Sequence, residues 1–530
     1  MQRMNMAVLQ VLVMTVAVVS CSAIAFSQTG SAPESPALKL TMEVDFGQDV
    51  GQNFGTLFEA TDPQGRVVAG AGFQGLYNTV ARSDRRTLQF FVRPANDAGQ
   101  VTLERLPRFS EDTGVYLFDM NGRLFAQPKY VERRVMTWEP TSGRWEAAPE
   151  PANTALRGGD GSMHLGEGRL TFIQGTISYN GKPILVPPQN ETFHHVYYAL
   201  GHLFFFHDRA GDAKDGAFTR ICACPWTPDQ ASADLARAIV QPLPTPHETT
   251  WAFGQIKGKV LTVSNKGGVY CFDGAAWKTL RAPDGKSYQV YSMLNYYDRL
   301  LLGQYPSGCL FEFDGEEVKP RESWPPPIPG VSRHAREAQA MALYRGDLYA
   351  GVWPWAELWR YDRNTKQWTA IGRVFTRPPV TDQVAHPFEA EIKAYNAAHG
   401  KNNVINDWGQ RLTSLAVAGD TLYAGTCNKG GTPRPADYTF IDDAMLKEYG
   451  QVQRLRRPGH LCGQVRWVKG PTPFQFLVAG GQMRLAQDGR ELASTRLDPS
   501  LAAGLKDAKI TWGNGMFGPL EGKIRATSED

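Results

Sequence analysis

Hydrophobic and polar positions alternate in short runs from Met341 to Gly372, MALYRGDLYAGVWPWAELWRYDRNTKQWTAIG. Polar turns at Arg345-Gly346-Asp347 and at Arg363-Asn364-Thr365-Lys366 separate these runs. A period of two with tight glycine, asparagine and aspartate turns predicts four short antiparallel strands. A sheet of this size has open faces and open edges, so it requires neighbours of the same kind.

The chain supplies such neighbours as repeats. The segment LLGQYPSGCLFEFDG aligns without a gap with YAGVWPWAELWRYDR and places Asp314 opposite Asp362. The segment LTVSNKGGVYCFDG continues the series with Asp273 opposite Asp314. The offsets, about 41 and 48 residues, lie within the range of propeller blades, each of which buries its face by stacking on the next. The sequence therefore predicts an all-β fold, a β-propeller of seven or eight four-stranded blades.

The end of the Met341–Gly372 repeat also resembles a known family. YDRNTKQW, from Tyr361 to Trp368, is similar to the ending of a kelch-type repeat, an aromatic-Asp turn followed by tryptophan. The resemblance covers three blades well, but a consistent Gly-Gly pair after the second strand is missing. It implies a kelch-like β-propeller repeat protein of the secreted, bacterial type.

The first residues are predicted to lie outside this fold. Arg3 is followed by an apolar run that ends at Phe26, which is typical of a secretory signal peptide over residues 1–27. Val18-Val19-Ser20-Cys21 also matches a bacterial lipobox, which would attach a lipid anchor to Cys21. A free secreted protein and a lipoprotein both stay open. Either would have no membrane span in the mature chain and would be secreted, periplasmic or associated with the cell envelope.

The rest divides into a linker over residues 28–43 and a propeller over residues 44–530. Two long insertions, Arg373–Trp408 and Asn428–Gly459, are each predicted to carry a short helix. The last segment, 464–530, is interpreted as a closing blade that shares strands with the N-terminal segment. The alternative is a sandwich resembling laminin-G and concanavalin domains. It would be partial, because a complete sandwich needs about a hundred residues and this segment is shorter.

Composition limits the classes of function that the sequence supports. The chain has 56 Lys and Arg against 53 Asp and Glu, so nothing indicates a nucleic-acid footprint or an anionic membrane surface. Cys222 and Cys224 share one face of a predicted strand, and with four further cysteines after Cys21 they are interpreted as core residues or disulfide partners. The histidines near Asp208 are interpreted as strand-edge residues. We expect no cofactor and no metal.

In a propeller, the loop entering a blade's first strand and the loop joining its second and third strands open on the same face. Tryptophans with arginines on such a face suit a ligand pocket, and tryptophan suits sugar rings. The predicted ligand contacts are Trp251, Trp353, Trp355, Trp408, Arg336 and Arg411. The weak catalytic candidates are Glu248, Glu337, Asp407, His247 and His334.

Catalytic motifs are missing from the sequence: there is no Gly-x-Ser-x-Gly elbow, HExxH, P-loop or dinucleotide fingerprint. The favoured hypothesis is therefore a non-enzymatic, monomeric protein that binds a glycan or an envelope protein. A carbohydrate-active hydrolase or lyase on a propeller, and a protein-assembly scaffold, are the alternatives.

Overall fold

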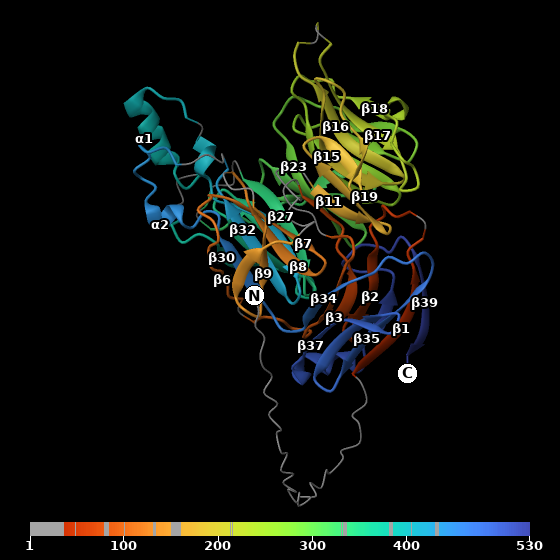
Figure 1. Ribbon diagram of the computed structural model, residues 1–530. Helices are drawn as coiled ribbons and strands as arrows, with labels where there is room; N and C mark the ends of the chain where they lie inside the picture. Colours follow the sequence, from red (N-terminus) through yellow and green to blue (C-terminus); the bar gives the residue numbers. More distant parts are fainter. Residues whose placement is uncertain are drawn as a thin grey trace, which may run out of the picture. The chain divides into compact units, whose positions relative to one another are not determined.

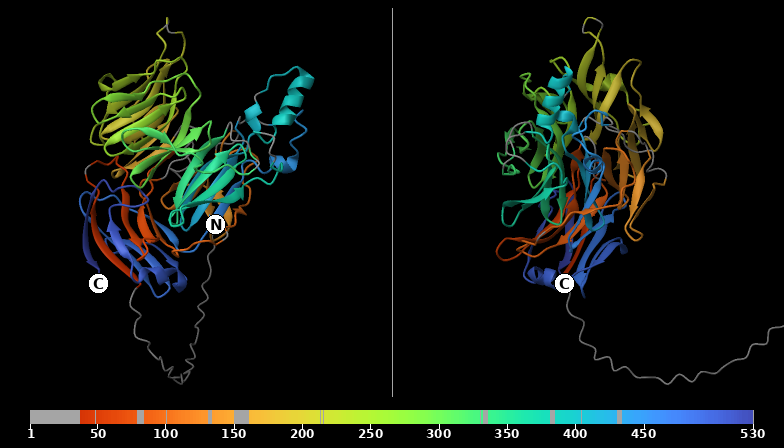
Figure 2. Two further views of the ribbon diagram at one scale, coloured as in Figure 1. Left: turned by 180° about the vertical axis from the view of Figure 1, so that it is seen from behind. Right: turned by 90° about the vertical axis from the view of Figure 1, so that its left-hand side faces the viewer.

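The computed structural model describes residues 37–47, 49–78, 84–99, 101–130, 134–149, 161–212, 214, 216–329, 331, 336–380, 385–403, 405–429 and 434–529. Within them, seven four-stranded antiparallel units follow one another along the chain (Figures 1 and 2). The first four are β7 (Val115–Met120), β8 (Arg123–Pro128), β9 (Met136–Glu139) and β10 (Arg144–Ala147); β11 (Gly161–Leu165), β12 (Gly168–Ile173), β13 (Thr176–Tyr179) and β14 (Lys182–Leu185); β15 (Thr192–Ala199), β16 (His202–Arg209), β17 (Phe218–Pro225) and β18 (Ile239–Pro242); and β19 (Thr250–Ile256), β20 (Lys259–Ser264), β21 (Val269–Phe272) and β22 (Trp277–Arg281).

The last three units contain the repeats that are clearest in the sequence. They are β23 (Gln289–Tyr296), β24 (Arg299–Tyr305), β25 (Leu310–Phe313) and β26 (Val318–Pro320); β27 (Glu337–Tyr344), β28 (Asp347–Trp353), β29 (Glu357–Asp362) and β30 (Gln367–Arg373); and β31 (Arg411–Ala418), β32 (Thr421–Cys427), β33 (Val452–Arg456) and β6 (Glu104–Arg105). Because β6 precedes the first unit in the chain and pairs with β33, it joins the last unit to the chain that enters the first.

Burial falls from the first to the fourth strand of the β27–β30 unit. All eight residues of β27 are buried, whereas β30, the fourth strand of the same unit, has none buried. The first strands of consecutive units contact one another, β19 with β23, β23 with β27, and β27 with β31. Stacked four-stranded meanders with buried first strands are β-propeller blades. The predicted all-β propeller is therefore confirmed.

The two predicted helix-bearing insertions are also present. The first carries α1 (Glu389–His399), which ends at Gly400 with a left-handed φ of 59°, a conformation that glycine adopts without strain. The second carries α2 (Asp443–Leu446), where the Asp442 side chain accepts a hydrogen bond from the Met445 amide. The described residues also include 3₁₀ segments at Leu235–Arg237, Ile405–Trp408 and Pro499–Leu505. Among the described helices, none is long and apolar enough to cross a membrane.

Strands from both ends of the chain form a β-sandwich. One sheet has the order β37-β36-β35-β1-β39 and the other β34-β5-β3-β2-β38, so each mixes early and late strands (red and blue in Figure 1). They share one apolar core, which includes Phe58 and Phe90 from one sheet and Phe476 from the other. The strands are β1 (Leu38–Asp45), β2 (Gly55–Thr61), β3 (Val67–Phe73), β5 (Thr87–Val92), β34 (His460–Gln464), β35 (Thr472–Ala479), β36 (Gln482–Gln487), β37 (Arg490–Arg496), β38 (Lys509–Trp512) and β39 (Lys523–Glu529).

This sandwich differs from the boundaries that the sequence predicted. The strand at Val44 belongs to the sandwich rather than to a blade, and segment 464–530 has the alternative form, a partial sandwich that shares strands with the N-terminal segment. The late residues alone are too few for a sandwich, but β1 pairs with β35 and β5 pairs with β34, so the N-terminal segment supplies the missing strands. Pairing across more than 370 residues leaves no local pattern in the sequence.

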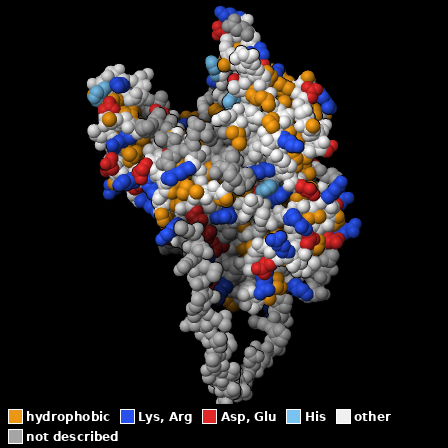
Figure 3. All heavy atoms as spheres, in the orientation of Figure 1, with side chains coloured by type: hydrophobic (Ala, Val, Ile, Leu, Met, Phe, Trp, Pro, Cys, Tyr) orange, Lys and Arg blue, Asp and Glu red, His pale blue; other side chains and the backbone are white. Residues whose placement is uncertain are grey.

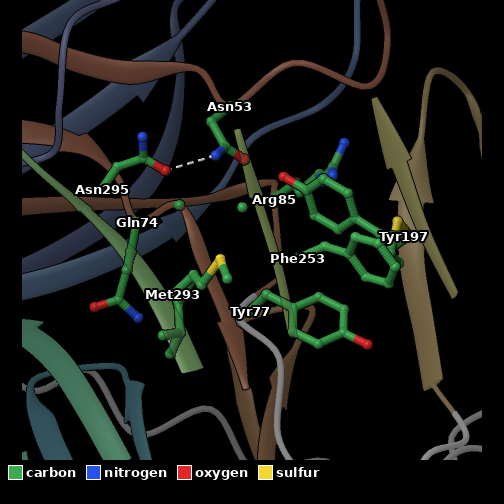
Figure 4. A pocket seen from close by; sticks show the side chains of 12 residues that line it. Asn53, Gln74, Tyr77, Arg85, Tyr197, Phe253, Met293 and Asn295 are labelled. Atoms are coloured by element: carbon green, nitrogen blue, oxygen red, sulfur yellow. Dashed lines mark hydrogen bonds between the residues drawn. The ribbon is translucent and has the colours of Figure 1, made fainter. Parts of the chain in front are cut away.

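A short strand from the sandwich segment enters the propeller. β4 (Leu76–Asn78) pairs with β23, with Leu76 opposite Leu294, and it also contacts β19 and β27. The Asn78 side chain donates a hydrogen bond of 3.1 Å to the carbonyl of Gln339. Beside it, a cavity of about 20 Å³ is lined by residues that include Tyr77 and Phe253 (Figure 4). This volume holds about one water molecule, so the cavity is too small for a larger ligand.

The chain that follows β4 brings two carboxyl groups together. His164 Nδ1 lies 2.7 Å from Asp84 Oδ1, and Thr87 donates a hydrogen bond of 2.7 Å to Asp119. Burial, with the Asp84 carboxylate as the second cause, raises the pKa of Asp119 to about 7. Between the ordinary pKa of an aspartate, about 4, and this value, the folded state holds a proton that the unfolded state has lost, so stability falls as the pH rises through that range.

Replacing Asp119 with asparagine is therefore expected to weaken the pH dependence of stability. The melting temperature of the unchanged protein should fall between pH 5 and pH 8, and the Asp119→Asn variant should lose less over the same range. Thermal melts followed by circular dichroism at both pH values check this. Parallel curves for the two proteins would contradict the assignment.

Candidate functional site

One end of the propeller gathers the loops that the sequence singled out. Isolated parallel bridges join Lys266 to Tyr288, Ser307 to Arg336, and Trp355 to Gln410. In each case the loop after a unit's second strand meets the chain that enters the next unit. These loops therefore lie on one face, together with the starts of β27 and β31.

Three of the four predicted tryptophans are covered on this face. Trp353, Trp355 and Trp408 are at most 1% exposed. Trp408 packs against Tyr449 from the second insertion, and the Arg373 guanidinium lies 4.8 Å from the Trp355 ring centre. This differs from the prediction that these rings contact a ligand. The insertions cover the rings, and an alignment of the repeats does not show that the insertions fold in this way.

The fourth tryptophan is accessible. Trp251 is half-buried and stacks on Tyr291, with ring centres 5.4 Å apart and an interplanar angle of 16°. Of the predicted arginines, Arg336 is 2% exposed and pairs with Glu357. Arg411 is 8% exposed and lies at the centre of the cluster described below.

The carboxylate candidates have partners within the protein. Glu248 is fully buried and accepts a hydrogen bond of 2.7 Å from the Tyr270 hydroxyl. Glu337 is also fully buried. Asp407 is half-buried, and burial raises its pKa, against the opposing effect of Lys429. His247 is exposed, and His334 lies outside the described residues. Glu248 and Glu337 are therefore both held by partners within the protein.

Three cations converge around Glu337, and we call Lys129, Arg411, Lys429 and Glu337 the cationic cluster. Arg411 Nη2 donates to both Glu337 carboxylate oxygens, at 2.6 and 2.8 Å. Lys429 Nζ lies 3.5 Å from Glu337 Oε2. Lys129, directly after β8, places its Nζ 3.8 Å from the Cys427 sulfur at the end of β32. Four sequence segments thus build one site.

Aromatic rings surround the cationic cluster. The Lys429 ammonium lies 4.5 Å from the ring centre of Trp353 and 4.9 Å from that of Tyr305. The Lys129 ammonium lies 4.5 Å from the ring centre of Tyr130. Such cation–π contacts fix the direction of each ammonium without neutralising its charge.

The cationic cluster has more positive charge than its carboxylate neutralises. Burial lowers the pKa of Lys129 and of Lys429, and in both cases the Arg411 guanidinium lowers it further. Burial is the largest effect on Arg411 and acts against its charge, but Glu337, Cys427 and Tyr291 together offset it, so the pKa of Arg411 is raised. The side chain of Asn428, next to Lys429, is fully buried, and among the residues that the structure describes neither of its polar atoms has a hydrogen-bond partner.

Buried polar atoms normally have partners, so Asn428 and the surplus cations indicate a place for an anionic or polar group. The Lys429 side chain is 24% exposed, so part of it reaches solvent. The repeat alignment could have identified Lys429 as a residue of this face, because Asn428-Lys429 aligns with Asn265-Lys266. It gave no signal for Lys129, whose unit repeats weakly.

Within the described ranges, the cysteines and the candidate metal ligands form no reactive centre. The six cysteines after Cys21 are all free. Cys222 lies 3.9 Å from His207, which contacts Glu191 at 2.6 Å, but the thiol is fully buried and burial raises its pKa to about 12. Among the described residues, no group of three or more His, Cys, Asp or Glu side chains could hold a metal ion.

Solved structures similar to this chain include WD40 and other repeat proteins. They include the WD40 repeats of RRP9 (10% identity, 67% of this chain and 99% of that chain, TM-score 0.37). The extracellular domain of a putative one-component system from B. thetaiotaomicron is 13% identical over 80% of this chain and 49% of that chain, with a TM-score of 0.34. BamB from Moraxella catarrhalis is 12% identical over 79% and 96%, with a TM-score of 0.28. No family model and no curated protein matches the chain.

Proposed function

We propose that this protein is a secreted or envelope-attached β-propeller that binds an acidic carbohydrate at the cationic cluster, without catalysis. The observation that carries the proposal is the meeting of Arg411 and Lys429 on one carboxylate, with Lys129 close to Arg411 and with the Asn428 side chain lacking a partner among the described residues. A carboxylate- or sulfate-bearing sugar would supply the missing negative charge, and its hydroxyls would supply partners for the amide.

Three further features support this proposal. The half-buried Trp251 stacks on the buried Tyr291, and an accessible tryptophan ring is a surface on which sugar rings pack. Basic and acidic side chains are interspersed on the face shown in Figure 3, so a local cluster rather than a broad basic surface would select the ligand. The signal-like N-terminal segment supports a location where such polymers are met.

The first test replaces Lys429 with alanine. Because a hydrogen bond to a charged group contributes about 1.5–3 kcal/mol, affinity for an acidic polysaccharide should fall about 10- to 100-fold. Calorimetric titration with polygalacturonate, and with dextran as the neutral polymer, measures the change. Lys266→Ala is the matched control, since Lys266 occupies the aligned position of another unit and belongs to no described ion pair.

Equal affinity of the Lys429→Ala and Lys266→Ala variants, or equal binding of dextran, would overturn the proposal.

A lyase is the second candidate, because the lowered pKa values of Lys129 and Lys429 are those of a lysine that can act as a base. The same titration samples should be assayed for new chain ends, whose appearance would replace the non-enzymatic proposal by this one.

A further inference from the structure

An open groove of about 300 Å³ lies between the β23–β26 and β27–β30 units, at the opposite ends of their strands from the cationic cluster. It is the size of a small ligand site. Its walls come from the β23–β24 turn, the chain after β26 and the β29–β30 turn. The residues used below are Tyr297, Arg299, Arg321, Trp324, Arg363 and Lys366.

Two aromatic side chains form fixed walls of this groove. Trp324 is half-buried, and its ring centre lies 4.6 Å from that of Tyr361 and 5.2 Å from that of Trp368. Tyr297 is half-buried, and its hydroxyl donates a hydrogen bond of 3.1 Å to Glu59. Packing on several sides holds both rings in place before any ligand arrives, so little ordering is required on binding.

The groove's four cations differ in how they are paired. Arg321 lies 2.7 Å from Glu312, and Arg299 pairs with Asp298. In the part of the chain that the structure describes, neither Arg363 nor Lys366 forms an ion pair with a carboxylate. Arg363 lies over the Tyr297 ring at 5.1 Å. The nearby Glu59 is 9% exposed, and burial raises its pKa, which favours its neutral form.

We infer that this groove is a second ligand site, which binds a single carboxylate-bearing sugar unit. Arg363 and Lys366 hold the carboxylate, since a guanidinium fork and an ammonium are the groups that recognise it. Trp324 and Tyr297 line the sugar ring. The inference does not depend on the cationic cluster, because the two sites share no residue and open at opposite ends of the strands.

The test titrates the full chain with galacturonate, with glucose as the neutral sugar and with inorganic phosphate. Lys366→Asn removes one cation at a turn position whose φ of 57° asparagine tolerates, so the variant should fold. Its affinity for galacturonate should fall about tenfold or more. Lys257→Asn is the matched control, a left-handed hairpin lysine of another unit with a φ of 52°.

The outcomes separate the two sites. Loss of galacturonate binding in Lys366→Asn but not in Lys429→Ala or Lys257→Asn supports the groove. Loss in Lys429→Ala with no change in Lys366→Asn overturns it and leaves the proposed function intact. Equal affinity for phosphate and galacturonate, or binding of glucose as tight as that of galacturonate, would also overturn it.

Discussion

Replacing Asp347 with asparagine is expected to lower the free energy of unfolding by about 3–5 kcal/mol, because removing one partner of a buried ion network leaves uncompensated charge. The Asp347 side chain is 0% exposed and lies 2.6 Å from Arg93, 2.6 Å from Arg360 and 3.5 Å from Arg457. Arg93 follows β5 of the sandwich, whereas Asp347 and Arg360 belong to β28 and β29 of the propeller. The network therefore ties the two parts together.

The surrounding charges sharpen this expectation. Asp97 and Asp362 also contact these arginines, and Arg345 pairs with Asp97, so four guanidinium groups meet three carboxylates. Asparagine at 347 would leave two carboxylates for four buried cations. Denaturant unfolding measures the loss. The control is Glu316→Gln, whose carboxylate is 83% exposed in its pair with Lys259 and should cost no more than about 1 kcal/mol. Similar losses in the two variants would refute the role of burial.

The blades could be predicted where local pattern determines structure. Asp273, Asp314 and Asp362, aligned by sequence alone, lie at or just after the ends of β21, β25 and β29. Strand alternation and turn chemistry act over a few residues, and the repeat confirms the period. The first two units carry weaker repeats, and the sequence placed their boundaries only loosely.

The sandwich and the candidate site could not be predicted in the same way. Residues that pair across the whole chain, such as Leu40 and Phe476, show no periodic relation in sequence. Lys129 lies near Arg411 because the β7–β10 unit is a neighbour of the unit that contains β31. Trp408 is covered because the second insertion packs over it through Tyr449. The sequence indicated which loops share a face, but not which of their side chains are covered.

Ending the chain at Gly459 is expected to abolish folding of the whole protein. The truncation removes β34 to β39. Among these strands, β35 pairs with β1 and β34 pairs with β5. It exposes the core around Phe58 and Phe90, and it deletes Phe517, which is 2% exposed and belongs to a core cluster with propeller residues such as Leu294. Burial of each such side chain contributes about 1.5–3 kcal/mol, and the sum exceeds the stability of an ordinary domain.

Solubility, circular dichroism and proteolysis of the truncated chain check this expectation. Two further experiments test whether the loss of folding comes from the missing sandwich strands and their core. Supplying residues 460–530 as a separate chain should restore a cooperative melt. Phe476→Ala, in the full chain, should cost about 3–5 kcal/mol, since the ring is fully buried with its centre 5.0 Å from that of Phe58. A truncated chain that melts cooperatively near the temperature of the full chain would show instead that the propeller holds itself closed through β6 and that the sandwich is an independent attachment.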